Sequence, residues 1–428
     1  MFETEELSMR PTIKQLCNFL DRSPSLYHAV DALRQEFEEA GFVCLQENTQ
    51  WELIPGGKYY LIRGGSAFVA FCVPAAAKGF SISACHDDRP GFKVKENLTL
   101  SGTYTRLGVE GYGGMLMSTW LDRPLGVAGR VFVETDHGVA CKLIDLDKDI
   151  ALIPSVAIHM NREANAGYKW NPAVDLQPLL GGKDSALKFK RLLEKAAGGK
   201  ILGHDLYLYP RQKAKLWGMD KEYLSAAGLD DLACVWGCAQ GLLNASNDSA
   251  VNVLCVFDSE EVGSSSTQGA DSTLLSDVLR RICAALSQPM EQMLANSFLV
   301  SADNAHAIHP NHPEYADSAN APVMGSGVVL KFNANLSYTT DGFSAAVLRK
   351  VWSDAGVPVQ TYYNRADLRG GSTLGHISTG HVSVPSADIG LAQLAMHSCI
   401  ETLAAKDASF LVDAMIAYYN ADIPALCQ

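Results

Sequence analysis

The chain has little positive charge and no long apolar run. Its 428 residues contain 35 Lys+Arg against 47 Asp+Glu, a net charge of -12. That balance argues against nucleic acid or an anionic membrane as the main partner. No apolar stretch reaches the roughly 18 residues that a membrane span requires. The acidic stretch 1–12 also lacks the apolar segment of a signal peptide. We therefore expect a cytoplasmic protein.

Motifs of several common enzyme classes are also missing. The sequence contains no H-E-x-x-H zinc helix, no G-x-S-x-G nucleophile turn and no phosphate-binding G-x-x-x-x-G-K-[ST]. The 11 cysteines form no C-x-x-C pair, and some, such as Cys72 and Cys255, lie inside apolar runs. They are expected to be free thiols in a reducing compartment. We expect the hydroxyl run 264–267 to be a turn and not a nucleophile.

Apolar patterns typical of helices and strands alternate at both ends of the chain. Hydrophobic residues make up 47% and charged residues 19%, as in a globular protein. Ser23 and Pro24 are expected to begin a helix that closes at Gly41. The alternation predicts the α/β fold class, with a mixed sheet sandwiched between helices.

The middle of the chain favours strands instead. A hairpin turn is expected at 136–138, and one amphipathic helix at 184–199 ends on a glycine. We predict a mostly β domain, residues 93–219, inserted into an α/β domain made of residues 1–92 and 220–428.

Acidic residues and histidines recur where apolar runs end. His86 follows one run, the trio Asp258, Glu260 and Glu261 follows another, and Asp303 follows a third. Ligands of open α/β sheets bind outside the carboxyl ends of strands, so these side chains can meet there. Three adjacent carboxylates need a counter-charge, and with histidines they are typical of a site for Zn²⁺ or similar ions.

Each of these residues also has a purely structural interpretation. Asp230 could cap the helix that follows it. His86 and His397 could be hydrogen-bonded core histidines. The run of His306, His309 and His312 could be a solvated loop. Their combination favours the metal site over these alternatives.

Several longer stretches match one family in order. They are SACHDDRPGFKVK, YGGMLMSTWLDRPLGVAGRV, IHMNREAN, GLDDL, DSEEVGS, SADNAHAIHPNH, DLRGGSTLG and LAMHS. Over most of its length the chain resembles the bacterial branch of the aspartyl aminopeptidase family, which are co-catalytic metallo-aminopeptidases. The resemblance implies two divalent ions per chain, most simply Zn²⁺, with Co²⁺ or Mn²⁺ possible. The implied ligands are His86, Asp230, Glu261, Asp303 and His397.

The same resemblance implies distinct roles around the ions. Asp230 would bridge them, with His86 and Asp303 on one ion and the remaining two ligands on the other. Glu260 would be the general base, and Asp88 would orient the His86 imidazole. The chain departs from the family pattern, which usually has a small or hydroxyl residue where this chain has Asp87 and a serine where it has Arg89. Met117 and Ser118 stand where some members carry Trp-His. Arg89 could neutralise Asp87.

Substrate binding and assembly also follow from the resemblance. His159, sometimes assigned as a metal ligand in the family, would reach the neighbouring subunit's active site. The inserted domain would form a homodimer, and dimers would join into a tetrahedral dodecamer. Lys331, unless it is a surface lysine, could pair with an acidic first residue of a peptide substrate. The residues expected to bind substrate are His159, Lys331, His306 and His309.

The expected activity is removal of the N-terminal residue from peptides, with a possible preference for Asp or Glu. Three alternatives stay open. The chain could be a broad or neutral-residue aminopeptidase of the same family. It could be a related di-metal carboxypeptidase or deacylase. An inactive scaffold would typically have lost ligands or the base, and this chain keeps them all.

Overall fold

The computed structural model describes residues 11–368 and 370–426, and its strands form three sheets. Residues 1–10 of the N-terminal stretch used above, and Cys427, therefore lie outside the described residues. Nine strands form a central sheet in the order β1-β2-β3-β13-β4-β14-β18-β16-β17, which is mixed parallel and antiparallel. These strands are β1 (Val43–Cys44), β2 (Lys58–Arg63), β3 (Ala67–Cys72), β4 (Gly79–His86), β13 (Ala250–Phe257), β14 (Phe298–Ala302), β16 (Val328–Phe332), β17 (Val359–Tyr363) and β18 (Ser386–Gly390).

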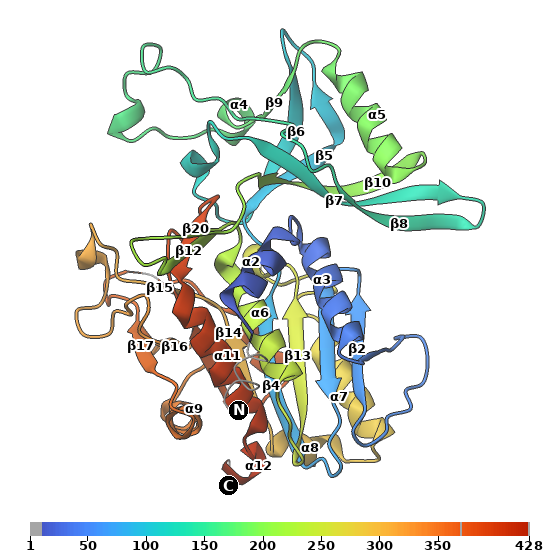
Figure 1. The fold of residues 1–428 in the computed structure, drawn as a ribbon, viewed down its shortest axis with the longest axis vertical. Coiled ribbons are helices and arrows are strands. Elements are labelled where there is room, and N and C mark those ends of the chain that lie inside the picture. The colour runs from blue at the N-terminus through green and yellow to red at the C-terminus, as the bar shows by residue number, and fades with distance from the viewer. Residues whose placement is uncertain (1–10, 369, 427–428) are drawn as a thin grey trace.

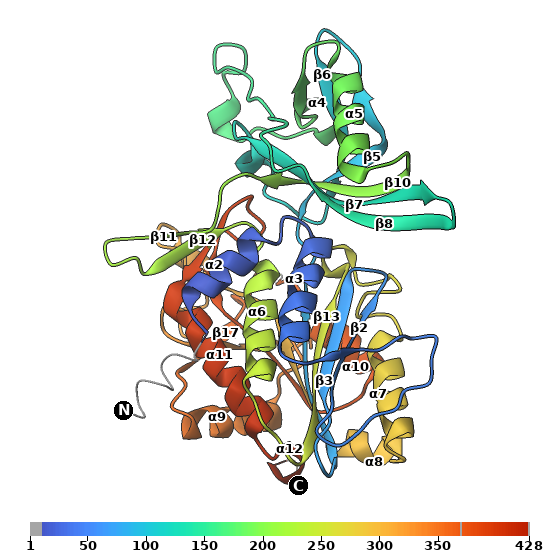
Figure 2. The same cartoon turned by 45° about the vertical axis from the view of Figure 1, so that its right-hand side comes forward.

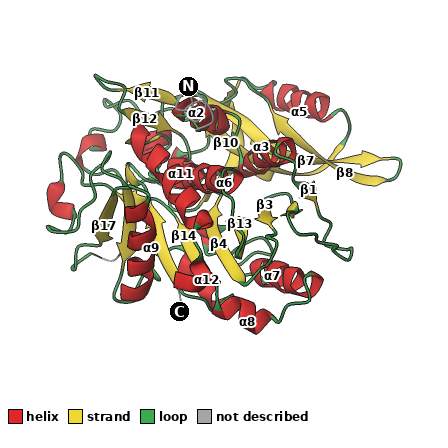
Figure 3. Cartoon of the chain, turned by 60° about the horizontal axis from the view of Figure 1, so that its bottom comes forward, coloured by secondary structure: helices red, strands yellow, loops and turns green. Residues whose placement is uncertain are grey.

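Helices cover both faces of the central sheet (Figures 2 and 3). One face carries α2 (Ile13–Asp21), α3 (Leu26–Glu39), α6 (Leu229–Leu243), α9 (Gly342–Asp354) and α11 (Ala405–Asn420). The other carries α7 (Leu274–Ala285), α8 (Met290–Ala295) and α10 (Leu374–His381).

Strand β13 shows why helices must pack on both faces of this sheet. All eight of its residues are buried. Leu254 and Val256 belong to the core beneath α6 and α11, whereas Val253 and Cys255 belong to the core beneath α7. Successive side chains of a strand point to opposite faces, so a strand that is apolar on both faces must be buried on both, and the polar Asn252 is buried with it. The predicted mixed sheet between helices is confirmed.

A second, six-stranded sheet projects beyond the central one, at the top of Figure 1. It has its own apolar core, and the hairpin that joins β7 (Leu125–Thr135) to β8 (Gly138–Asp145) turns at 136–137, as predicted. Its elements are β5 (Gly91–Leu100), β6 (Thr105–Tyr112), β7 (Leu125–Thr135), β8 (Gly138–Asp145), α4 (Pro172–Asp175), β9 (Leu179–Gly181), α5 (Ser185–Ala197) and β10 (Ile201–Pro210). Helix α5 ends on the left-handed Gly198, as expected.

A third, smaller sheet lies between these two. It contains β11 (Lys215–Trp217), β12 (Tyr223–Ala226), β15 (Ala305–His306), β19 (Ala392–Leu394) and β20 (Glu401–Ala404). Strand β12 leads through Gly228, the residue before α6, and β20 runs directly into α11.

Helices α6 and α11 pack closely because α6 has glycines, Gly237 and Gly241, on the side that faces α11. A Cβ added at Gly241 would lie 2.4 Å from the Met415 Cβ, and one at Gly237 would lie 2.5 Å from Leu411 Cδ2. The absence of side chains at these two positions fixes how near α6 approaches its neighbour. It therefore also fixes where the first turn of α6, which carries Asp230, lies.

One predicted helix start is wrong. The second helix begins at Leu26 after the N-cap Ser25, and not at Ser23 and Pro24. The Ser23 hydroxyl instead donates to the main-chain oxygen of Phe19, at 2.7 Å, and so closes the preceding helix. A serine can satisfy either helix end, and only the fold decides which.

The described cysteines agree with the expectation of free thiols. Ten of them are described, and all ten are free. Over the same residues, the search for a helix both long and apolar enough to span a bilayer finds none.

Candidate metal centre

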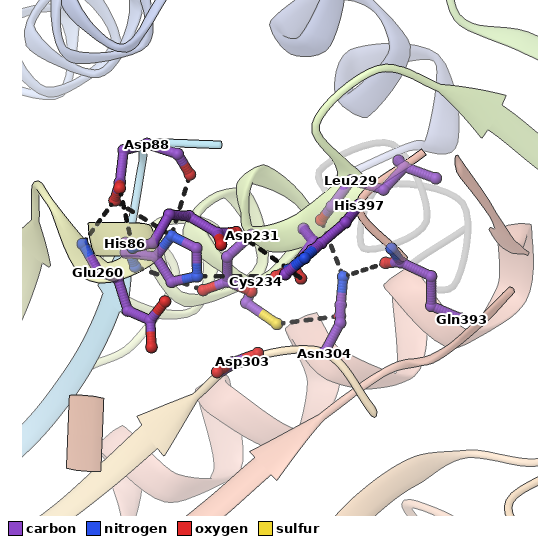
Figure 4. A network of polar contacts seen from close by, with 12 residues as sticks. His86, Asp88, Leu229, Asp231, Cys234, Glu260, Asp303, Asn304, Gln393 and His397 are labelled. Carbon is purple, nitrogen blue, oxygen red and sulfur yellow. Dashed lines mark hydrogen bonds and ion pairs between the residues drawn. The ribbon is translucent and has the colours of Figure 1, made fainter. Parts of the chain in front are cut away.

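Three parallel neighbours of the central sheet end at the same edge. Strand β4 lies between β13 and β14 and is parallel to both. His86 is the last residue of β4, Asp303 directly follows β14, and Glu260 and Glu261 lie in the short 3-10 turn after β13. The strand ends therefore bring these side chains together. Figure 4 shows His86, Glu260 and Asp303 gathered there, with Asp88 on the opposite side of the imidazole.

Two ligand groups form at this edge, and they share Asp230. One contains His86, Asp230 and Asp303, and the other contains Asp230, Glu261 and His397. Within each group the candidate ligand atoms lie within 4.8 Å of one another. The shared carboxylate comes from the start of α6, and His397 from the loop between β19 and β20.

Both histidines present the same nitrogen to the carboxylates. His86 Nδ1 lies 3.0 Å from the main-chain oxygen of Asp88, and His397 Nδ1 lies 2.9 Å from that of Gly114. Each Nδ1 therefore carries the proton and donates it. With Nδ1 as the donor, each Nε2 faces a carboxylate with its lone pair. His86 Nε2 lies 3.6 Å from Asp230 Oδ1, and His397 Nε2 lies 3.2 Å from Glu261 Oε1. A nitrogen lone pair and a carboxylate repel each other, and a cation bound between them removes that repulsion.

Two carboxylates of the ligand groups each have an oxygen that lacks a hydrogen-bond donor in the described part of the chain. Asp230 Oδ1 and Glu261 Oε1 are buried and accept no hydrogen bond from the described residues. The surroundings of His397 show the same need for positive charge. Burial alone would lower the pKa of His397, yet its contacts with Asp230 and Glu261 raise that pKa to about 11. Two imidazoles with three carboxylates are a donor set that suits zinc, so the residues present fit the metal that the resemblance implies.

Asp88 organises the residues around His86 through both ends of its carboxylate. Its Oδ1 accepts the main-chain N–H of Glu260 at 3.0 Å, and its Oδ2 accepts that of Glu261 at 3.1 Å. The Tyr112 hydroxyl donates to Oδ2 at 2.7 Å, and Oδ1 lies 3.4 Å from His86 Nδ1. One carboxylate thus positions an imidazole and both glutamates.

Glu260 lies beside the ligand groups and forms no ion pair with a lysine or arginine among the described residues. Burial, together with the charges of Asp303 and Glu261, raises the pKa of Glu260 to about 8, against the opposing effect of His86. A carboxyl group with such a pKa can both accept and release a proton near neutral pH.

A cavity of about 310 Å³ opens beside the ligands. Lys331 borders it but is a buried residue, with 2% of its surface exposed, so the surface-lysine alternative is wrong. Its Nζ donates to the main-chain oxygens of Asp303 and Asn304, both at 3.0 Å, and lies 3.6 Å from Asp303 Oδ1. Burial, only partly offset by the Lys331 charge, raises the pKa of Asp303 to about 6.

The other three candidate substrate residues lie in different places. His306 borders this cavity and packs edge-on against Tyr362. His309 lines a neighbouring cavity that shares His306 with the first. His159 is exposed in a turn of the projecting part, outside the residues that line either cavity.

Two buried carboxylates at this edge were assigned no role from the sequence. Glu401 accepts the main-chain N–H of Asp230 at 3.0 Å and that of His397 at 2.7 Å, so it holds two ligand-bearing segments. Burial, together with the Asp230 charge, raises the pKa of Glu401 to about 8. Asp231 accepts the main-chain N–H of His86 at 3.3 Å. A second acidic residue within GLDDL, and Glu401 four residues after His397, were the available signals.

Comparison with known proteins gives matches over nearly the whole chain. Residues 19–419 match the family described as aminopeptidase I zinc metalloprotease, M18. A probable M18 family aminopeptidase 2 of Clostridium acetobutylicum is 40% identical over 424 residues, covering 95% of this chain and 98% of that protein. A similar protein of Pseudomonas savastanoi is 37% identical over 417 residues, covering 94% and 97%.

Solved structures agree. The cryo-EM structure of a complex of Ape4 and Nbr1 matches with a TM-score of 0.92 at 34% identity, covering 95% of this chain and 85% of that one. The mApe1 dodecamer of S. cerevisiae matches with a TM-score of 0.86 at 25% identity, covering 97% of each chain. The resemblance to the aspartyl aminopeptidase family is thereby confirmed. The chain belongs to the M18 family of aminopeptidases, which are zinc metalloproteases.

Proposed function

We propose that this chain holds two divalent cations, most simply zinc, and removes the N-terminal residue of peptides. His86 and Asp303 would hold one cation, Glu261 and His397 the other, and Asp230 both. The observation that carries the proposal is the convergence of two imidazole Nε2 atoms and buried carboxylate oxygens around Asp230. Co²⁺ or Mn²⁺ could occupy the same donor set.

The residues around the ligands have separate roles in the proposed reaction. When bound, the two cations would acidify a water molecule and polarise the peptide carbonyl. Glu260 takes the proton from the attacking water and returns it to the leaving amine. Asp88 holds both His86 and the Glu260 main chain in place. Carboxylates of the cluster can pair with the substrate's free α-amine, which would restrict cleavage to the first residue.

Preference for an acidic first residue is a further part of the proposal. Lys331 and His306 border the cavity beside Asp303, and His309 lies in the adjoining one. Because Lys331 already donates to two main-chain oxygens, it would act mainly through its positive charge. His306 and His309 would supply hydrogen bonds to the substrate.

Assembly completes the proposed site. The related mApe1 of S. cerevisiae forms a dodecamer. By analogy we propose that residues 93–219 of this chain form a dimerisation domain, that dimers build a tetrahedral dodecamer, and that the protein is cytoplasmic. His159, exposed in the projecting part, would then enter the neighbouring subunit's cavity and bind the substrate or its developing oxyanion.

Metal removal and restoration test the proposed function. Chelation followed by dialysis should abolish hydrolysis of fluorogenic aminoacyl substrates, and zinc, cobalt or manganese should restore it. Matched substrates with blocked N-termini should resist cleavage before and after restoration. Full activity in metal-free protein would refute the mechanism, and preferential cleavage of blocked substrates would point to a di-metal carboxypeptidase or deacylase.

A further inference from the structure

A further group of possible ligands lies beside the catalytic cluster and contains only carboxylates. Asp87, Asp88 and Asp258 each offer an oxygen, and these oxygens lie within 4.8 Å of one another. The residues follow the adjacent parallel strands β4 and β13, whose ends are joined by a 3.0 Å hydrogen bond from the Asp87 N–H to the Phe257 oxygen. The register of two strands thus brings three negative charges together.

Asp87 is the unusual member of this group. Its side chain is almost fully buried, with 1% of the residue exposed, and neither carboxylate oxygen accepts a hydrogen bond from the described residues. A buried carboxyl group without a partner is unfavourable, so native proteins neutralise it, pair it or bind an ion beside it. The free oxygens of Asp87 belong to the same group of ligand atoms that includes its two acidic neighbours.

The adjacent arginine does not supply the missing charge. The Arg89 guanidinium donates to the main-chain oxygen of Pro24 at 2.6 Å, and the side chain lines a different cavity that also contains Glu401. No ion pair or hydrogen bond between Arg89 and Asp87 occurs in the described part of the chain. The expectation that Arg89 neutralises Asp87 is therefore wrong, and Asp87 needs another counter-charge.

Asp88, the second member of the group, is held in place by its own partners. Its carboxylate accepts two main-chain N–H groups and the Tyr112 hydroxyl. A divalent cation balances two charges and gives the free Asp87 oxygens a partner.

We propose that Asp87, Asp88 and Asp258 form a third cation site, specific for a hard divalent ion such as Ca²⁺ or Mn²⁺. All three side chains are oxygen donors, which hard cations prefer, whereas the histidines of the catalytic cluster suit zinc. The site shares Asp88 with the network that positions His86, Glu260 and Glu261. The ion would stiffen that network and takes no part in bond making or breaking.

Binding is measured on the zinc-loaded protein. Tb³⁺ replaces Ca²⁺ at oxygen sites and emits when a neighbouring tyrosine absorbs, and Tyr112 contacts Asp88 directly. We expect tyrosine-sensitised Tb³⁺ emission that Ca²⁺ or Mn²⁺ displaces and that K⁺ does not. Asp87→Asn and Asp258→Asn should weaken binding at least ~10-fold without changing zinc content. Asp271→Asn, at an exposed carboxylate paired with His381, is the control.

Thermal unfolding gives a second readout that does not depend on activity. Ca²⁺ should raise the Tm of the zinc-loaded wild type and leave that of Asp87→Asn unchanged, because only the folded wild type binds it. Without Ca²⁺ the variant should be at least as stable as the wild type, since it lacks a buried unpaired charge. Wild-type protein that binds no ion beyond its zinc, or an Asp87→Asn variant that binds Tb³⁺ normally, would overturn the proposal. Neither result would bear on the peptidase activity.

Discussion

The central sheet and the projecting sheet both carry residues that the sequence marks as functional, yet they present them very differently. At the edge of the central sheet, His86, Asp230 and Asp303 are buried and mutually in contact. In the projecting part, His159 stands exposed in a turn, away from the cavities beside the cluster. Buried, interacting groups define a site within one chain, whereas an isolated exposed residue acquires a role only through a second molecule.

Separate replacement of the two adjacent glutamates by glutamine should give the largest effect at the buried site of the central sheet. Glu260→Gln should keep both metals and the fold and should lower kcat by at least ~10², since it removes only the positioned base. Glu261→Gln should instead lose one metal. Metal analysis beside steady-state kinetics separates the two outcomes. Equal losses of metal and rate in both variants would show that the glutamates do not divide the work.

The variant His159→Ala tests the role of the exposed histidine in the projecting part. Loss of one hydrogen-bond donor to the oxyanion should lower kcat about 10²-fold and leave metal content intact. Co-assembly of His159→Ala with Glu260→Gln should recover part of the activity, because mixed dimers contain one composite site with both residues. If mixed oligomers are demonstrated and no activity returns, His159 does not act across an interface.

Glu401 tests whether contacts behind the ligands matter as much as the ligands' own side chains. Glu401→Gln replaces one of two acceptor oxygens by an amide NH2, which can only donate and therefore cannot accept the main-chain N–H. We expect a 10–100-fold loss of metal affinity in competition with a chelator. Thr402→Ser, at the next position of β20, keeps its contact with Ser225 and is the matched control. Unchanged affinity in Glu401→Gln would leave Glu401 with a structural role only.

The smallest expected effect concerns the cavity wall. If Lys331 and His306 favour an acidic first residue, kcat/KM should be about tenfold higher for Asp or Glu substrates than for Leu, a difference of ~1.4 kcal/mol. His306→Gln should reduce this preference without loss of metal. A strong preference for Leu would contradict the acidic assignment and favour a neutral-residue or broad aminopeptidase.

Side chains that follow strands could be predicted from the sequence, and contacts to the main chain could not. His86, Glu261 and Asp303 were predicted to meet because parallel strands end at one edge. Glu401 was missed because its partners are N–H groups of residues 230 and 397, which no pattern of residue types reveals. The start of α3 was misplaced for the same reason, since Ser23 bonds the main chain of Phe19.

The scatter of the proposed ligands along the chain has a consequence for biosynthesis. The five residues lie between positions 86 and 397, and α11, which packs against α6, is made after the last of them. A chain emerging from the ribosome N-terminus first cannot hold both cations until almost all of it has been translated. Under this assignment, a growing chain stays unable to cut peptides, and newly made protein gains its activity only after translation is nearly complete.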